Sequence, residues 1–327
     1  MNLSLKRGAD EKTRGHEYTC MHTNKNWLGI LLVCGPAIAA SRPDLSISAK
    51  VNGSALTIRT SARTAGAIDS ITWRGKEFIN AFDHGRELQS ASSFDGYGEC
   101  LNPTEAGSDK DGAGPSSSSR LVSGHAHGRT LETTIEMAYW LVPGTPYHTA
   151  CGNHADFRQA KNETVRSSDT LVKRVTIAGN AISYDATFVT SEDHQSATFE
   201  AITGYMPPEF TEFLAYDPAT RAIVPLSDGP GEQPLPVILA TPDRNFAMAV
   251  YSPGLPQKKY AEAGYGRFKF LNNPKLANWN TVKWNAVYRE APVPQGQYHY
   301  HCYVLVGTVD DVRRALDGLT QSGKARD

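Results

Sequence analysis

The densest group of residues that could do chemistry lies between positions 83 and 105. Acidic, basic, amide and aromatic residues follow one another there in three runs: Asp83–Gln89, Phe94–Glu99 and Asn102–Glu105. In an extended chain His84 and Arg86 project from the same side, because side chains alternate along a strand. A histidine and an arginine on one face can hold a carboxylate or polarise a sugar oxygen, and nearby glycines let a ligand approach the backbone. The alternative is a solvated strand end in which Arg86 pairs with Glu87 or Glu99.

A second group, YHYHCY at Tyr298–Tyr303, alternates histidine with tyrosine. If this segment is a strand, His299, His301 and Tyr303 project together from one face, while the alternate residues face the core. Side chains on one face lie ~7 Å apart, which suits a metal only where other groups converge. Because imidazole titrates near neutrality, we expect an acid, base or substrate-contacting role for these histidines rather than metal binding. A metal-dependent enzyme built on them is the alternative.

Aromatic and amide residues gather around Trp279 and Trp284, downstream of Arg267. Sugars present flat C–H faces and a rim of hydroxyls, so tryptophan beside asparagine and arginine suits them. The alternative for either tryptophan alone is packing in the core. Glu200 and Tyr205 lie on another aromatic-bearing strand and its exit.

These groups give two sets of candidate site residues. The expected catalytic residues are His84, Arg86, Glu105, Glu200 and His299. The expected substrate-binding residues are Gln89, Tyr97, Glu99, Asn102, Tyr205, Arg267, Trp279, Trp284 and His301. Hydrolysis of a glycoside needs two carboxylates, for which the best candidates are Glu99, Glu105 and Glu200. A lyase reaction instead needs a histidine or tyrosine base, with Arg86 neutralising a uronate carboxylate. No cofactor and no metal ion is expected.

Charge and motifs argue against several other classes of protein. The charges nearly balance, with 33 basic against 34 acidic residues, and no basic stripe indicates nucleic acid. The sequence has no GxSxG elbow, phosphate-binding loop, GxGxxG or HExxH motif, and no CxxC pair to support structural zinc. The charge census therefore argues against nucleic acid and favours no particular partner. A carbohydrate substrate is expected from the aromatic, amide and arginine residues described above.

The N-terminus predicts export. Residues Asn26–Ala40, NWLGILLVCGPAIAA, form an apolar run that follows Lys25 and ends in small residues, which is the layout of a secretory signal peptide. The run is shorter than the ~20 apolar residues of a membrane span. We therefore expect a leader over residues 1–40, a single domain over 41–327 without a membrane span, and a secreted or periplasmic protein. Met21 is the expected natural start, and a buried core helix is the alternative for this segment.

Three cysteines remain after the expected leader: Cys100, Cys151 and Cys302. Three are too few for a disulfide scaffold. Either one bridge with a free thiol or three unpaired buried cysteines is expected.

The elements that must position these residues are mostly strands. Leu45–Val51 and Ala55–Thr60 flank the turn signal Asn52-Gly53, which predicts a hairpin. Further strands are expected at 131–141, 171–177, 182–188, 197–205, 237–240, 246–251, 281–289 and 298–306. Only residues 309–319 have a helical pattern, with acidic residues in the first turn. The order of elements predicts an all-β fold, a large antiparallel β-sandwich with one short C-terminal helix.

The segment Gly66–Gln89, GAIDSITWRGKEFINAFDHGRELQ, resembles the opening of galactose-mutarotase-like sandwich proteins, in which a strand pair leads to a Gly-Arg dipeptide at a sugar site. Gly85-Arg86 matches that dipeptide, and Pro294–Gly307 is similar to the turn and strand that precede the closing strands. The resemblance implies a β-supersandwich, which epimerases, glycoside hydrolases, polysaccharide lyases and non-catalytic domains share. For an epimerase it implies a histidine acid and a glutamate base. The candidates for that pair are His84 or His299 with Glu105 or Glu200.

The sequence therefore predicts an exported carbohydrate-active enzyme that cleaves or rearranges a poly- or oligosaccharide. A lyase is slightly favoured over a hydrolase, because histidine, tyrosine and arginine are abundant among the candidates. One alternative is a non-catalytic sugar-binding or envelope-assembly protein, which would use the same aromatic surface without needing His84 or Glu105. Another is an aldose epimerase-like enzyme.

Overall fold

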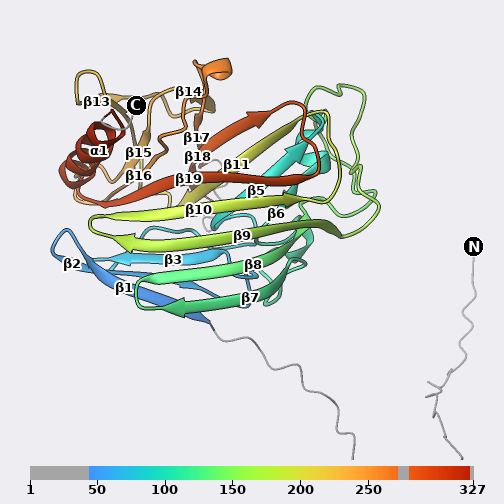
Figure 1. The fold of residues 1–327 in the computed structure, drawn as a ribbon, viewed down its shortest axis with the longest axis horizontal. Helices are drawn as coiled ribbons and strands as arrows, with labels where there is room; N and C mark the ends of the chain where they lie inside the picture. The colour runs from blue at the N-terminus through green and yellow to red at the C-terminus, as the bar shows by residue number, and fades with distance from the viewer. Residues whose placement is uncertain (1–43, 272–279, 325–327) are drawn as a thin grey trace, which may run out of the picture. The chain divides into compact units, whose positions relative to one another are not determined.

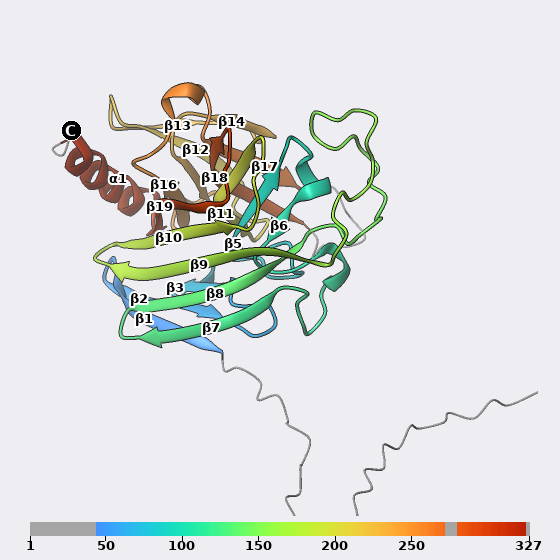
Figure 2. The same ribbon diagram turned by 45° about the vertical axis from the view of Figure 1, so that its right-hand side comes forward.

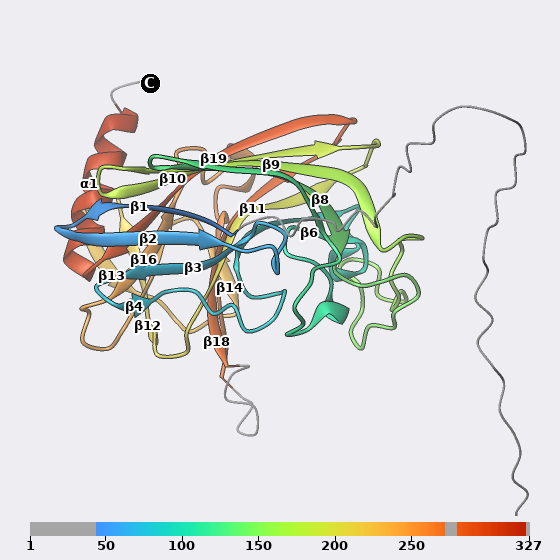
Figure 3. The same ribbon diagram turned by 90° about the horizontal axis from the view of Figure 1, so that it is seen from below.

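A computed structural model of the chain describes residues 44–271 and 280–324. Its strands form two facing sheets, which Figure 1 and Figure 3 show in views that differ by a quarter turn. The expected boundary between leader and mature domain lies outside the described residues, as does Trp279.

Strands make up about half of the described residues. The first nine are β1 Leu45–Val51, β2 Ser54–Thr60, β3 Ile68–Trp73, β4 Lys76–Glu77, β5 Leu88–Phe94, β6 Pro103–Thr104, β7 Arg120–His127, β8 Thr130–Tyr139 and β9 Arg166–Ala178. The others are β10 Ala181–Thr190, β11 Ala197–Met206, β12 Glu212–Asp217, β13 Ala222–Pro225, β14 Gly231–Gln233, β15 Val237–Ala240, β16 Ala247–Tyr251, β17 Tyr265–Phe270, β18 Thr281–Glu290 and β19 Gly296–Gly307. The helical elements are the 3-10 turns η1 Gly98–Leu101, η2 Asp109–Asp111 and η3 Lys258–Tyr260, and the α-helix α1 Val309–Lys324.

The pairings divide the strands into two antiparallel sheets. One has the order β7–β8–β9–β10–β19–β16–β15–β12–β13. The other has the order β1–β2–β3–β5–β11–β18–β17–β14. The short strand β6 pairs with β5 in one sheet and with β8 in the other, so it joins the two sheets. The expected all-β sandwich is confirmed.

The hairpins follow the sequence pattern. Asn52 and Gly53 both have positive φ, 48° and 77°, which is the two-residue turn that matches the twist of the flanking strands β1 and β2. In β10, every second residue from Ile182 to Phe188 is buried, and the strand pairs on both sides with β9 and β19. The period-two pattern therefore predicted the inward face of this central strand.

The main core lies between the two sheets and contains large side chains from both, among them Trp73, Phe94, Phe188, Phe199 and Trp284. A second cluster lies under α1, where Val309, Val312 and Leu316 pack on residues from β12, β15, β16 and β19. The helix begins after Thr308, whose hydroxyl accepts a hydrogen bond from the Asp311 amide at 3.1 Å. It is longer than the expected 309–319. No helix among the described residues has the length and apolar character needed to cross a membrane.

Candidate functional site

Two adjoining cavities lie on the face of the β5–β11–β18 sheet that points away from the main core. The smaller has a volume of about 210 Å³ and is lined by Gly85, Gln89, Ala91, Glu99, Asn102, Thr104, Trp140, Tyr147, Glu200, Thr203, Tyr205 and Lys283. The larger has a volume of about 570 Å³ and is lined by Phe82, Asp83, His84, Gly85, Arg86, Ser108, Asp109, Gly112, Ala113, Trp140, Tyr205, Phe270 and Thr281. Because Gly85, Trp140 and Tyr205 line both cavities, the two form one cleft.

A β-bulge in β11 brings the polar residues of the smaller cavity together. Glu200 is opposite Val287 and Ile202 is opposite Ala286, so Ala201 is an extra residue without a partner in β18. Residues five apart on a regular strand point to opposite faces, whereas the bulge reverses the alternation. Glu200 and Tyr205 consequently line the same cavity.

Lys283 of β18 forms an ion pair with Glu200. Its Nζ atom lies 3.0 Å from Oε2 of Glu200 and 3.4 Å from Oε1. Burial alone would raise the pKa of Glu200, but the Lys283 charge and hydrogen bonds from Lys283, Asn285 and Thr203 hold that pKa below its ordinary value. Burial alone would lower the pKa of Lys283, but the charge of Glu200 raises it overall. The pair is therefore ionised at neutral pH.

The pKa of Glu99, which lines the same cavity, is shifted in the opposite direction. Burial raises the pKa of its carboxyl group, the Lys283 charge partly offsets this effect, and the nearby Glu200 carboxylate adds to it. The smaller cavity thus holds one carboxyl group that favours its proton and one that favours its charge. Two carboxyl groups whose surroundings separate their pKa values are the arrangement that acid–base catalysis uses.

A disulfide bond holds the turn that carries Glu99. Cys100, the next residue in η1, is bonded to Cys151, while Cys302 is a free, buried thiol. The Cys100 carbonyl also accepts a hydrogen bond of 2.8 Å from the Lys161 amide. Cys151 and Lys161 belong to the long connection between β8 and β9, which Figure 2 shows beyond the ends of the strands. Of the two cysteine arrangements expected, one bridge with a free thiol is the one observed.

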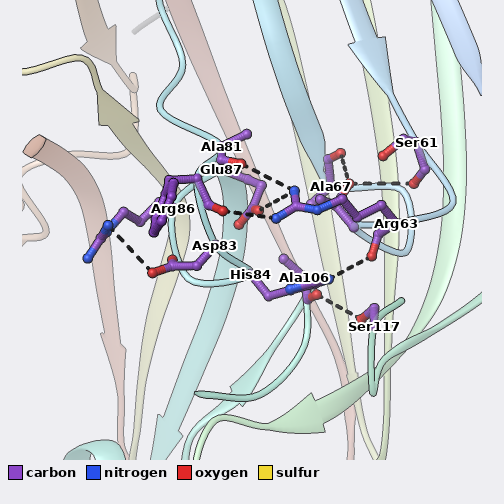
Figure 4. Close-up of polar contacts among 12 residues, drawn as sticks. Ser61, Arg63, Ala67, Ala81, Asp83, His84, Arg86, Glu87, Ala106 and Ser117 are labelled. Carbon is purple, nitrogen blue, oxygen red and sulfur yellow. Dashed lines mark hydrogen bonds and ion pairs between the residues drawn. The ribbon is translucent and has the colours of Figure 1, made fainter. Parts of the chain in front are cut away.

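Arg63 ties together the segments that wall the larger cavity (Figure 4). Its guanidinium group donates hydrogen bonds to the carbonyls of Ala81 at 3.2 Å, Phe82 at 3.1 Å and Gly114 at 3.1 Å. Glu87 is fully buried, and its carboxylate lies 4.0 Å from the guanidinium. Burial raises the pKa of Glu87 well above its ordinary value, although Arg63 acts in the opposite direction.

The His84 side chain is buried and contacts the backbone of two of these segments. The ring is 1% exposed, with Nδ1 2.8 Å from the Gly112 carbonyl and Nε2 2.9 Å from the Arg63 carbonyl. Both nitrogens are thus engaged with the backbone, and neither is presented to the cleft as the acid or base that the sequence predicted.

The predicted residues separate into those that the structure brings to the cleft and those that it does not. The predicted residues that line the cleft are His84, Arg86, Gln89, Glu99, Asn102, Glu200 and Tyr205. The predicted residues that lie elsewhere are Tyr97, Glu105, Arg267, Trp284, His299 and His301. Trp279 lies outside the described residues.

Glu105 and Trp284 are core residues. The Glu105 carboxylate pairs with the fully buried Lys173 and accepts a hydrogen bond from the Ser90 amide at 2.9 Å. The predicted catalytic role of Glu105 does not fit this position, because the ion pair satisfies the carboxylate inside the sandwich. Trp284 is 0% exposed and packs over Gly204, where an added Cβ would lie 2.5 Å from the indole. The alternative of core packing therefore holds for Trp284.

Two other predicted residues, Tyr97 and Arg267, do not line the cleft. Tyr97 stacks on His154, with ring centroids 3.7 Å apart. Arg267 donates hydrogen bonds to the backbone carbonyl of Ser227 at 2.9 Å and to its hydroxyl at 2.7 Å.

The histidine pair of β19 projects from one face, as predicted, but that face lies on the sheet opposite the cleft. His301 Nδ1 lies 2.7 Å from Asp185 Oδ1, and His299 Nε2 lies 3.6 Å from the same atom. In the ranges that the structure describes, no group of three or more histidine, cysteine or acidic side chains is arranged to hold a metal ion.

Sequence reasoning missed Lys283, Trp140 and Tyr147. Lys283 had a usable signal, because it is the first charged residue in a strand whose first eight residues are all buried. A charge in such a strand needs a partner. Trp140 and Tyr147 follow β8 in an irregular segment, and nothing in their spacing indicated the cleft.

Comparison with known proteins finds similarity in structure only. No protein-family model matches the chain, and no curated protein sequence matches it. A galactose mutarotase related enzyme from Lactobacillus acidophilus is similar over 83% of this chain and 99% of its own, with 11% identity and a TM-score of 0.44. A putative aldose 1-epimerase from Escherichia coli K12 is similar over 82% of this chain and 100% of its own, with 8% identity and a TM-score of 0.42.

A heparan sulfate lyase from Pedobacter heparinus is similar over 82% of this chain but only 36% of its own, with 6% identity and a TM-score of 0.43. The similar structures are therefore galactose-mutarotase-like proteins and other carbohydrate-active enzymes, the class that Gly66–Gln89 resembles. At these identities the likeness concerns the fold, and no residue takes its role from these proteins.

Proposed function

We propose that this chain is a carbohydrate-active enzyme that performs acid–base chemistry on a neutral saccharide in the smaller cavity. The observation that supports this proposal is the pair Glu99 and Glu200, two carboxyl groups on one cavity whose pKa values are shifted in opposite directions. Glycoside hydrolysis needs such a pair, one group protonated and one ionised.

Each residue of the cavity has a role in this proposal. Glu99 donates its proton to the glycosidic oxygen as the bond to the anomeric carbon breaks. Glu200 supports attack on that carbon, either directly or by taking a proton from water, and water supplies the new hydroxyl group. Lys283 keeps Glu200 ionised. The amide and hydroxyl groups that can bind sugar hydroxyls are those of Gln89, Asn102, Thr104 and Thr203.

The charges of the cleft favour a neutral substrate over a uronic acid. Among the described residues, the lysine and the arginine that line the cleft each face a carboxylate, Lys283 with Glu200 at 3.0 Å and Arg86 with Asp83 at 3.5 Å. A lyase must neutralise the carboxylate of its substrate, and Arg86 was expected to do so. Burial also raises the pKa of Tyr205, which disfavours this residue as a base. We therefore favour hydrolysis over elimination.

Export is part of the proposal. The signal-peptide layout of Asn26–Ala40 supports it, and so does the Cys100–Cys151 bridge, because disulfides persist in oxidising compartments. Fractionation of cells that express the full chain, followed by N-terminal sequencing, is expected to find protein outside the cytoplasm that begins at Ser41. Protein retained in the cytoplasm with residues 21–40 intact would overturn this part.

The catalytic part is tested by screening the protein against neutral and uronic-acid polysaccharides while reducing ends and ultraviolet absorbance are followed together. We expect reducing ends without new absorbance from a neutral polysaccharide. Glu99→Gln and Glu200→Gln should each lower the rate by ~10²–10⁴-fold, the usual contribution of general acid–base catalysis. Glu132→Gln is the matched control, because Glu132 is exposed and pairs with Arg174 away from the cleft. New absorbance would show a lyase instead.

A non-catalytic sugar-binding protein is the second candidate, because Glu200 is already engaged with Lys283. It predicts saccharide binding without products from any polymer. An epimerase-like enzyme would use the same acid and base on a free aldose, which proton NMR of the two anomers would detect. The polysaccharide screen and the NMR assay together separate the three activities.

A further inference from the structure

We propose that the larger cavity is a second sugar subsite, so that the substrate is a neutral oligosaccharide of at least two units. The unit that reacts lies in the smaller cavity between Glu99 and Glu200, and its neighbour lies in the larger one. This inference rests on the function proposed for the smaller cavity.

Trp140 lies at the boundary between the two subsites. Its side chain lines both cavities. Its amide donates a hydrogen bond to the Asn102 carbonyl at 2.7 Å, and its carbonyl accepts one from the Asp109 amide at 2.8 Å. Asn102 lines the smaller cavity and Asp109 the larger, so the backbone of Trp140 is fixed between the two.

Gly85 makes room for this indole. A Cβ atom at Gly85 would lie 2.6 Å from Cη2 and 3.1 Å from Cζ3 of Trp140, so any larger residue would displace the ring. The Gly-Arg dipeptide noted in the sequence therefore has a definite place in the cleft. Its glycine packs against the Trp140 ring, and its arginine lines the larger cavity.

The walls of the larger cavity suit a sugar ring. Phe82, Trp140 and Phe270 supply aromatic surface for the C–H face of a ring, while Ser108 and Thr281 supply side-chain hydroxyls for hydrogen bonds to its rim. The volume of about 570 Å³ falls in the range of ~300–1,000 Å³ typical of small-molecule sites, whereas the 210 Å³ of the smaller cavity falls below it. A single free sugar in the smaller cavity would leave most of the cleft empty.

The charges of this cavity point to a neutral neighbour unit. Arg86 faces Asp83 at 3.5 Å, and burial raises the pKa of Asp109. Among the described residues that line this cavity, the one arginine is therefore already paired with a carboxylate, which disfavours a uronate or sulfate group.

Calorimetric titration with sugar ladders tests the proposal. The probes are glucose, xylose, mannose and arabinose with their homo-oligomers of two to four units, titrated into the Glu99→Gln variant so that turnover is slow. For at least one ladder we expect Kd to fall about tenfold or more from one unit to two. Adding Phe270→Ala should remove that gain and leave the one-unit Kd within about twofold, because Phe270 lines only the larger cavity. Phe270 is 47% exposed, so its truncation spares the core.

His299→Ala in the same background is the control, since His299 lies on the opposite sheet and should change neither Kd. A ladder in which Kd is independent of length would overturn the second subsite while leaving the proposed function standing. A gain with length that survives Phe270→Ala would overturn its placement in this cavity. No binding of any probe, together with no turnover of any polymer, would overturn the proposed function and this inference with it.

Discussion

Single residues decide the charge state of the smaller cavity. Glu99 and Glu200 are chemically identical, and their pKa values differ in direction because Lys283 contacts Glu200 directly while burial dominates at Glu99. Two glutamates that do not line the cleft also differ in their partners. Glu105 forms an ion pair with Lys173 in the core, whereas Glu87 lies 4.0 Å from the Arg63 guanidinium. Partner geometry, rather than burial alone, therefore sets the role of each carboxyl group.

Replacing Lys283 with methionine should move the acidic limb of the pH profile of kcat/KM to higher pH. Glu200 would lose the cation that lowers its pKa, so it would take up a proton at a less acidic pH. The profile measured from pH 3 to pH 9 checks this. Lys269→Met, which removes a surface partner of Asp228, should leave the limb in place. An acidic limb unchanged in Lys283→Met would show that Glu200 does not control it.

Replacing Glu87 with glutamine should stabilise the protein at neutral pH. The folded-state pKa of Glu87 is raised above its unfolded value, so the folded state binds the extra proton and stability falls as pH rises from ~4.5 toward the folded pKa. The slope is up to ~1.4 kcal/mol per pH unit. The gain in Tm should thus grow from pH 4.5 to pH 7 and vanish below pH 4.5. A glutamine variant that is less stable at pH 7 would show that Glu87 is ionised and held by Arg63.

At the level of elements, a bulge and a 3-10 turn position the carboxyl groups of Glu200 and Glu99. The bulge at Ala201 reverses the alternation of β11, so that Glu200, Thr203 and Tyr205 share the cleft face. The turn η1 holds Glu99 over the same face, and its Cys100–Cys151 bridge closes a loop across 51 residues. The geometry of the carboxyl pair therefore depends on one strand irregularity and one covalent bond.

Replacing both Cys100 and Cys151 with serine should lower stability and activity together. In the chain-entropy model a bridge with a sequence separation of 51 contributes about 4 kcal/mol, so Tm should fall by several degrees. Below the new Tm, kcat should fall at least tenfold because Glu99 is no longer fixed. Urea unfolding and turnover at 25 °C provide the two readouts. Full kcat with reduced stability would mean that the bridge does not position Glu99.

At the level of the whole molecule, the sequence predicted the sandwich better than the site. Period-two patterns such as Ile182 to Phe188 and turn signals such as Asn52-Gly53 are local, and the core follows from them. The cleft depends on contacts between residues that are far apart in the sequence. The pairing of Glu105 with Lys173 involves residues 68 positions apart, and Trp140 reaches Gly85 across 55 positions. No local pattern shows which carboxyl group finds a buried cation and which faces solvent.

The architecture explains why the cleft is found where it is. The main core fills the space between the sheets, and the cleft uses the opposite face of β5–β11–β18, which the segments after β4, β5 and β8 cover. Side chains on that face can change without altering the core. This separation is typical of folds that support several activities, and the residues of the site must therefore identify the reaction.

The proton-donor role of Glu99 is tested by the release of reducing ends from neutral polysaccharides by the wild-type protein and by Glu99→Gln, measured across pH. We predict turnover of at least one neutral polymer with a bell-shaped pH profile, in which Glu99 gives the alkaline limb because it must be protonated. Glu99→Gln should lower the rate ~10²–10⁴-fold and remove that limb. Equal rates and an unchanged alkaline limb in the two proteins would contradict the assignment of Glu99 as the proton donor.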